Sequence, residues 1–163
     1  MEGHHCGLLS HVSRRSRSPL VALVPPSRTP CPSRPVLRRC ALRLDDGTPV
    51  CWGRNLGFNQ IDIPEDYLTQ EFRTIDAGCY HTCALRAADS KVRCWGSDDK
   101  GGYDSTTGDF YSIDPTSGQA TPPNPDQAYK AIAGCSHYTC ALTEPEGAIE
   151  CWCAPRPTRA SQT

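Results

Sequence analysis

One phrase of the sequence is repeated: Cys83-Ala84-Leu85-Arg86, followed after seven residues by Cys94-Trp95-Gly96. The same phrase occurs twice more, as Cys40-Ala41-Leu42-Arg43 with Cys51-Trp52-Gly53 and as Cys140-Ala141-Leu142-Thr143 with Cys151-Trp152. The two cysteines are 11 positions apart in every copy. A fixed internal spacing found three times is typical of a repeat protein, so we interpret the chain as an array of similar units.

Each copy is predicted to be a β-hairpin in which the two cysteines face each other. This register also pairs apolar residues in the arms: Ala41 with Val50, Leu85 with Val92, and Leu142 with Ile149. The chain then reverses at Asp45-Asp46, Ala88-Asp89 and Pro145-Glu146. Asp, Gly and Pro suit the backbone dihedrals of a tight turn, and apolar arms around such a turn are a hairpin signal.

The hairpin register makes a disulfide possible in each copy. Opposed residues of an antiparallel pair have Cα atoms roughly 4.5 to 5.5 Å apart, within the range that a disulfide accepts. We therefore predict the bridges Cys40–Cys51, Cys83–Cys94 and Cys140–Cys151. The alternative is that these cysteines are small buried apolar side chains. The pattern leaves open the redox state of the other cysteines: Cys6, Cys31, Cys79, Cys135 and Cys153.

The composition indicates the cellular compartment in which the chain folds. A chain of 163 residues with 11 cysteines is typical of an oxidising compartment, so we expect an extracellular or cell-surface, secreted protein. The only apolar run of the N-terminal arm, Leu20 to Val24, is too short for a recognisable signal peptide. The chain has no run of 18 apolar residues, so we expect no membrane span.

Charge divides the chain into three parts. Residues 1–39 carry seven arginines and one glutamate, and we expect a disordered basic arm rich in Arg, Pro and Ser. Residues 40–152 carry eight basic and seventeen acidic residues and contain the repeats, at 40–76, 77–127 and 128–152. An acidic repeat region would repel phosphates, so we expect it to bind no nucleic acid. Residues 153–163 are expected to form a disordered tail.

The second repeat contains an insertion at residues 97–127, rich in Asp, Gly, Ser and Thr. Insertions in repeat proteins form surface loops on one face, often the binding face. Tyr103, Phe110 and Tyr111 are the candidate partner-contact residues because aromatic side chains dominate interface energetics. The acidic residues of the insertion could bind calcium, but their spacing fits no known calcium loop, so a solvated loop is the favoured interpretation: Asp98, Asp99, Asp104 and Asp109.

One short segment has the composition of half a zinc site. Cys79, His81 and Cys83 alternate, so an extended chain would place all three on one face. The other two copies do not repeat this alternation, and we favour a structural histidine, bonded to backbone beside a packed cysteine. We predict no metal site, no cofactor and no catalytic residue.

The repeated phrase resembles the regulator-of-chromosome-condensation repeat in its cysteine-rich form. The resemblance covers about residues 40–152, and its clearest copy combines Phe72-Arg73-Thr74-Ile75-Asp76-Ala77-Gly78, His81-Thr82-Cys83-Ala84-Leu85 and Val92-Arg93-Cys94-Trp95-Gly96. It implies an all-β protein, a partial β-propeller of two to three blades with four antiparallel strands per repeat. Family propellers close with about seven blades, so we expect the chain to be a fragment of a larger propeller.

The resemblance implies a protein-interaction module rather than an enzyme. We expect a protein partner and no small-molecule substrate. Two alternatives stay open: guanine-nucleotide exchange on a small GTPase, as in the founding member of the family, and inhibition of a secreted hydrolase.

Overall fold

A computed structural model describes residues 21–23, 38–53, 55, 58–98, 100–103, 110–114, 118–135 and 137–153. These residues form β-strands and one short 3-10 turn, η1 (Glu65–Tyr67), which confirms the all-β class. The described part of the chain contains no helix long and apolar enough to cross a membrane.

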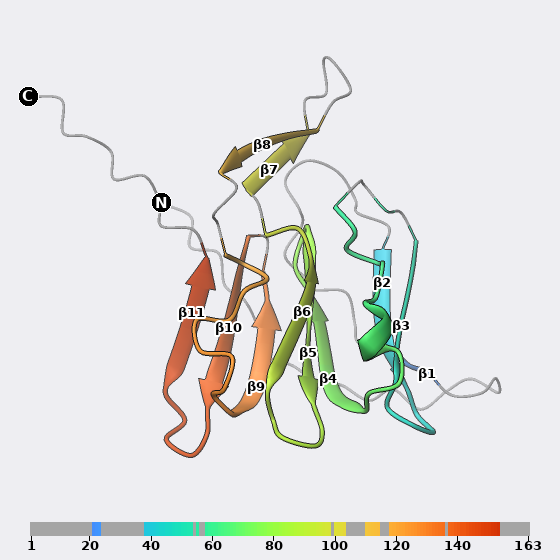
Figure 1. Ribbon diagram of the computed structural model, residues 1–163, viewed down its shortest axis with the longest axis vertical. Helices are drawn as coiled ribbons and strands as arrows, with labels where there is room; N and C mark the ends of the chain where they lie inside the picture. Colours follow the sequence, from blue (N-terminus) through green and yellow to red (C-terminus); the bar gives the residue numbers. More distant parts are fainter. Residues whose placement is uncertain are drawn as a thin grey trace, which may run out of the picture.

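Three antiparallel sheets of three strands each lie side by side (Figure 1). The first sheet has the order β1 (Val21–Leu23), β2 (Arg38–Arg43), β3 (Pro49–Gly53). The middle sheet has the order β4 (Phe72–Ala77), β5 (His81–Arg86), β6 (Val92–Gly96). The third sheet consists of β9 (Tyr129–Gly134), β10 (Tyr138–Thr143) and β11 (Ile149–Cys153), with β10 in the centre.

The three hairpins have the predicted registers: Ala41 pairs with Val50, Leu85 with Val92, and Leu142 with Ile149. Each turn is closed by one equivalent backbone bond of 2.9 Å: Arg43 N to Thr48 O, Arg86 N to Lys91 O, and Thr143 N to Ala148 O. The last turn residue has a positive φ in all three, 67° at Gly47, 61° at Ser90 and 74° at Gly147. Glycine is favoured at this position because a left-handed backbone crowds a Cβ.

Each pair of neighbouring sheets encloses its own apolar core. Between the first and middle sheets, Cys40 and Leu42 pack with four residues of the middle sheet: Phe72, Ile75, Ala84 and Trp95. Between the middle and third sheets, Cys83, Leu85 and Val92 pack with the matching residues of the third sheet: Tyr129, Ile132, Ala141 and Trp152. The middle sheet is therefore buried on both faces, as its repeated apolar residues require.

The described strands add two details to the expected architecture. Each of the three large sheets has three described strands, where the resemblance implies four per repeat. The strand β1, within the N-terminal arm, pairs with β2 from Val21↔Arg43 to Leu23↔Ala41. In the first sheet, β1 therefore occupies the edge beside the central strand that β4 and β9 occupy in the other two sheets.

The insertion at residues 97–127 is also more regular than the expected surface loop. It contains a fourth, two-stranded sheet of β7 (Lys100–Tyr103) and β8 (Phe110–Asp114). In Figure 1 this hairpin stands beyond one end of the three large sheets. Its glycines and polar residues hide the strand signal that the apolar arms of the other hairpins make clear.

Candidate functional site: a stapled scaffold and its projecting hairpin

Each hairpin of the three large sheets contains one disulfide. The bridges are Cys40–Cys51, Cys83–Cys94 and Cys140–Cys151, the three pairs that the sequence predicts. Their Cα atoms are 4.1, 4.0 and 4.0 Å apart. A hydrogen-bonded pair closes each turn, and hydrogen-bonded and non-hydrogen-bonded pairs alternate along an antiparallel ladder. The cysteines therefore form a non-hydrogen-bonded pair, where the two strands approach most closely.

The remaining cysteines divide into described and undescribed positions. Cys79 and Cys135 are buried and disulfide-bonded, which settles the redox state that their spacing leaves open. Cys6, Cys31 and the Cys153 side chain lie outside the described residues. Since Cys79 and Cys83 are both bridged, neither supplies a thiolate to the half zinc site considered above. Among the described residues, no cluster of three or more His, Cys, Asp or Glu side chains could hold a metal ion.

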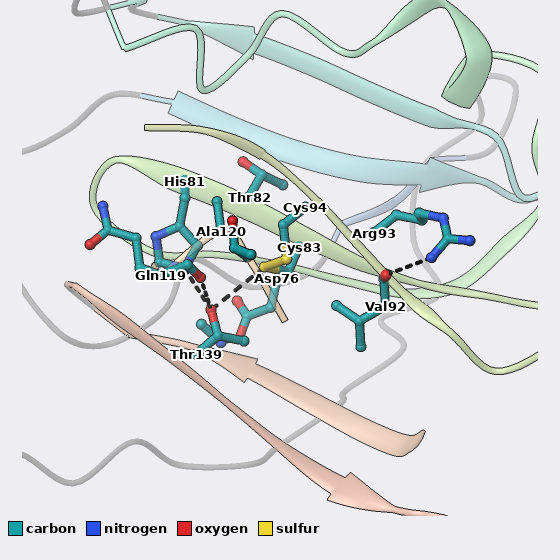
Figure 2. The surroundings of a disulfide bond; sticks show 12 residues. Asp76, His81, Thr82, Cys83, Val92, Arg93, Cys94, Gln119, Ala120 and Thr139 are labelled. Carbon is teal, nitrogen blue, oxygen red and sulfur yellow. Dashed lines mark hydrogen bonds between the residues drawn. A yellow bond between two sulfur atoms is a disulfide. The ribbon is translucent and has the colours of Figure 1, made fainter. Parts of the chain in front are cut away.

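A buried polar network surrounds the middle disulfide (Figure 2). The Thr139 hydroxyl donates to Gln119 O at 3.0 Å and lies 3.5 Å from Cys83 Sγ. His81 Nε2 lies 2.7 Å from the same hydroxyl oxygen. A hydroxyl has one hydrogen, so Thr139 accepts from His81, and the hydrogen of the imidazole is on Nε2. The histidine therefore donates to a side chain of the neighbouring sheet.

The same arrangement recurs between the first and middle sheets. The Thr82 hydroxyl donates to Gln60 O at 3.0 Å and lies 3.7 Å from Cys40 Sγ. In both places, the threonine before the first cysteine of one sheet contacts the first cysteine of the preceding sheet. The sequence signal for this network is the repetition in register of Thr82-Cys83 and Thr139-Cys140, which the hairpin pattern alone does not explain.

These contacts assign a structural role to the polar residues of the repeat. His81, Thr82 and Thr139 are fully buried, so solvent and substrate do not reach them. The two hydroxyls donate to backbone carbonyls, which is the opposite of a nucleophile whose proton is held by a base. The network positions neighbouring sheets relative to each other.

Two further contacts tie the middle sheet to the third. Arg73 Nη2 donates to Tyr129 O at 2.6 Å and lies 3.7 Å from Glu144 Oε1. Asp76 Oδ2 accepts from Gly134 N–H at 2.9 Å. Burial raises the pKa of Asp76 above the ordinary 3.8, although its hydrogen bonds from Gly134 and Ala77 oppose the shift.

The projecting β7–β8 hairpin emerges from a closed neck. Asp98 O accepts from Gly118 N–H at 3.1 Å, and its carboxylate accepts from Ala120 N–H and from the Thr121 hydroxyl, each at 2.6 Å. Gln119 Nε2 also donates to Ser97 O at 2.9 Å. The neck thus holds the two ends of the insertion together.

Asp98 is one of the four aspartates of the insertion that could bind calcium, and the neck gives it a structural role. Both carboxylate oxygens of Asp98 accept hydrogen bonds from the chain, so this residue closes the loop. Asp99, Asp104 and Asp109 lie outside the described residues. The position of Asp98 in the repeat is the sequence signal for this role: Asp98 lies three residues after Trp95, as Asn55 lies three residues after Trp52. Asn55 also forms a hydrogen bond within its loop, but in the opposite sense, because its side-chain amide donates to the Asp62 carboxylate at 2.6 Å.

The backbone of the hairpin includes all three partner-contact candidates. Tyr103 is the ladder partner of Phe110, and Tyr111 is the partner of Gly102. The side chains of Tyr103, Phe110 and Tyr111 lie outside the described part of the chain. Their role in binding stays a prediction.

Comparison with known proteins supports the repeat and the fold. The family model described as the regulator of chromosome condensation (RCC1) repeat matches residues 72–101. These residues include the middle sheet and the start of the projecting hairpin.

Two plant structures are similar to this chain. The entire ectodomain of the Physcomitrella patens receptor kinase CR4 is 24% identical, with a TM-score of 0.54, over 72% of this chain and 27% of that one. The CRINKLY WD40 ectodomain of the Arabidopsis thaliana receptor kinase ACR4 is also 24% identical, with a TM-score of 0.51, over 74% of this chain and 36% of that one. This chain therefore spans about a quarter of the first ectodomain and about a third of the second.

WD40 domains are β-propellers, in which small antiparallel sheets are arranged radially as blades. The three sheets here pack face to face in the same manner, with a disulfide across the hairpin of each. The chain thus carries a regulator of chromosome condensation repeat within a partial, cysteine-rich β-propeller fold.

Proposed function

We propose that this chain is a non-enzymatic propeller-repeat module that binds another protein through the β7–β8 hairpin. Residues 40–152 form the working unit, between the flanks 1–39 and 153–163. The observation that carries the proposal is the neck at Asp98 and Gly118, which presents an inserted hairpin on a scaffold of disulfide-bridged sheets. Fixing the base of a binding loop lowers the entropy lost when the loop is immobilised by a partner.

Tyr103, Phe110 and Tyr111 are the proposed contacts. Aromatic residues are enriched among the side chains that contribute most to protein–protein binding. Their positions in β7 and β8 concentrate them on a short ladder, since Tyr103 pairs with Phe110 and Gly102 with Tyr111. The buried and bonded polar residues of the large sheets favour a scaffold role for the rest of the repeat.

An extracellular or cell-surface location belongs to this proposal. Disulfides persist in oxidising environments and are rare in the cytosol. Every large sheet contains one such bridge. The partner would therefore be another extracellular protein.

The experiment excises the hairpin and leaves the scaffold intact. Gly118 N–H bonds directly to Asp98 O, so residues 99–117 can be replaced by a short Gly-Ser link without separating the sheets. A partner is identified by cross-linking to the whole chain, and its affinity is then measured for the whole chain, the excised chain and a Tyr103→Ala/Phe110→Ala/Tyr111→Ala variant. We expect affinity to fall by about tenfold or more in both altered chains.

A matched control removes apolar side chains elsewhere. Leu44 and Leu68 are exposed and lie outside the hairpin, so Leu44→Ala/Leu68→Ala should leave the affinity unchanged. Equal affinity of the excised and whole chains would contradict the proposal. So would accelerated nucleotide release from a small GTPase, which is the result that the exchange-factor alternative requires.

A further inference from the structure

The two interfaces between neighbouring sheets contain matching glutamines, Gln60 and Gln119, and both are fully buried. The backbone oxygen of each accepts a hydrogen bond of 3.0 Å from the threonine that precedes the first cysteine of the next sheet; Figure 2 includes the contact at Gln119. Each glutamine also follows a residue with a positive φ, 53° at Asn59 and 68° at Gly118. The two glutamines therefore occupy equivalent positions in the fold.

Between the middle and third sheets, the glutamine and the tryptophan find partners within the protein. The carboxamide of Gln119 donates from Nε2 to Ser97 O at 2.9 Å. The indole of Trp152 donates from Nε1 to Gln119 O at 3.1 Å. Direct hydrogen bonds thus join the polar groups of this interface.

Between the first and middle sheets, the same groups have no such partners. Gln60 is 0% exposed, and neither Nε2 nor Oε1 of its carboxamide has a hydrogen-bond partner anywhere in the described residues. Trp95, which matches Trp152, is 5% exposed, and its Nε1 also has no partner there. Gln60 lies against this tryptophan, because a Cβ on the adjacent Gly96 would be 3.1 Å from Gln60 Cα. Buried polar groups without a protein partner are typically bonded to internal water, because leaving them unpaired is costly.

We propose that the interface between the first and middle sheets contains an internal water site at Gln60 and Trp95. Oε1 of Gln60 only accepts a hydrogen bond, whereas Nε2 and the indole Nε1 only donate. A cation would leave both N–H groups unpaired, and an anion would leave the oxygen unpaired. Water both donates and accepts, and it is small enough for a fully buried position. The site lies inside the array of sheets and does not depend on the proposed function.

The test measures contact between water and each indole N–H by NMR in the whole, disulfide-intact chain. The chain has three tryptophans, so isotope-labelled tryptophan gives three indole signals. The Trp95 N–H should show a cross-relaxation peak to water, with the sign given by a water molecule that tumbles with the protein. The Trp152 N–H bonds to a backbone oxygen and should show none.

The Trp152 signal is also a control for magnetisation relayed through a hydroxyl group. A threonine is the ladder partner of both tryptophans, Thr82 for Trp95 and Thr139 for Trp152, so any relay would affect the two signals alike. A missing peak at Trp95, or equal peaks at Trp95 and Trp152, would overturn the proposal. This measurement needs no altered chain, so it decides the proposal even where a variant does not fold.

Two variants test whether the carboxamide holds the water. Gln60→Met removes the polar group at similar side-chain length, so the Trp95 peak should be lost. The urea midpoint should not rise, because a hydrated glutamine is already hydrogen-bonded. Gln119→Met is the matched control: it removes the bond to Ser97 O and should leave the Trp95 peak unchanged. A Trp95 peak that survives in Gln60→Met, or a raised midpoint in that variant, would contradict the water site.

Discussion

The first and middle sheets contain the same sequence phrase but bury it to different extents. Trp95 is buried between two sheets, whereas Trp52 at the matching position is 39% exposed. The hairpin, the turn and the disulfide are the same in both. The local sequence is therefore sufficient to form the hairpin, whereas the packing of neighbouring sheets determines how much each residue contributes to stability.

The largest expected difference comes from the two tryptophans. Trp95→Ala should lower the free energy of unfolding by about 3 to 5 kcal/mol, because it leaves a cavity between two packed sheets. Trp52→Ala should cost about 1 kcal/mol or less, because the side chain is already partly in solvent. Urea unfolding of both variants under non-reducing conditions measures the contrast. Equal losses would show that Trp52 is covered in solution.

The disulfides allow a similar comparison between the third and middle sheets. Replacing Cys140 and Cys151 by alanine should cost about 3 kcal/mol, the loop entropy that a bridge of this separation removes from the unfolded chain. Replacing Cys83 and Cys94 should cost more, because Cys83 is also packed in the core against the third sheet. Urea unfolding of the two double variants tests the order. The reverse order would contradict the burial assigned to the middle sheet.

The hairpin turns give a smaller contrast. Gly147→Ala should cost about 1 kcal/mol, because φ is 74° and the nearest neighbour of a Cβ would be Lys130 Nζ at 3.9 Å. Gly47→Ala should cost more, because a Cβ there would meet Phe72 O at 2.9 Å. Thermal unfolding of both variants measures the difference. Ser90→Gly is the control at the third matching position and should be neutral or slightly stabilising.

The smallest expected effect depends on pH. Because burial raises the pKa of Asp76 in the folded chain, the folded state binds the proton more tightly than the unfolded state. Its contribution is therefore fully present below the ordinary value of 3.8 and is lost as pH rises through the raised value. Asp76→Asn keeps an acceptor for Gly134 N–H without the charge, so the variant should gain stability relative to the unaltered chain from pH 3 to pH 7.

Asp126 provides the opposite control for this measurement. Its pKa is lowered by the hydrogen bond from Lys91, so Asp126→Asn should lose stability relative to the unaltered chain over the same range. Stability is measured by urea unfolding at each pH. A difference that is independent of pH for Asp76→Asn would contradict the raised pKa.

Much of the fold can be predicted from the repeated phrase. The 11-residue spacing and the turn residues predict the register, and the register predicts the three bridges. The projecting hairpin is harder to predict, because Lys100-Gly101-Gly102-Tyr103 lacks the apolar alternation of a strand. The strand β1 is also hidden, because it lies in an arm whose composition is typical of disorder.

The hairpins, their turns and their disulfides follow from local sequence, because these depend on residues within about a dozen positions of one another. The packing of the sheets determines which faces are buried, how Thr82 and Thr139 contact the preceding sheet, and how Asp98 closes the neck of the insertion. These contacts join residues 22 to 56 positions apart, and no local pattern encodes them. Trp52 and Ile149 are residue types found in protein cores, but no described sheet packs against either of them, so both are exposed.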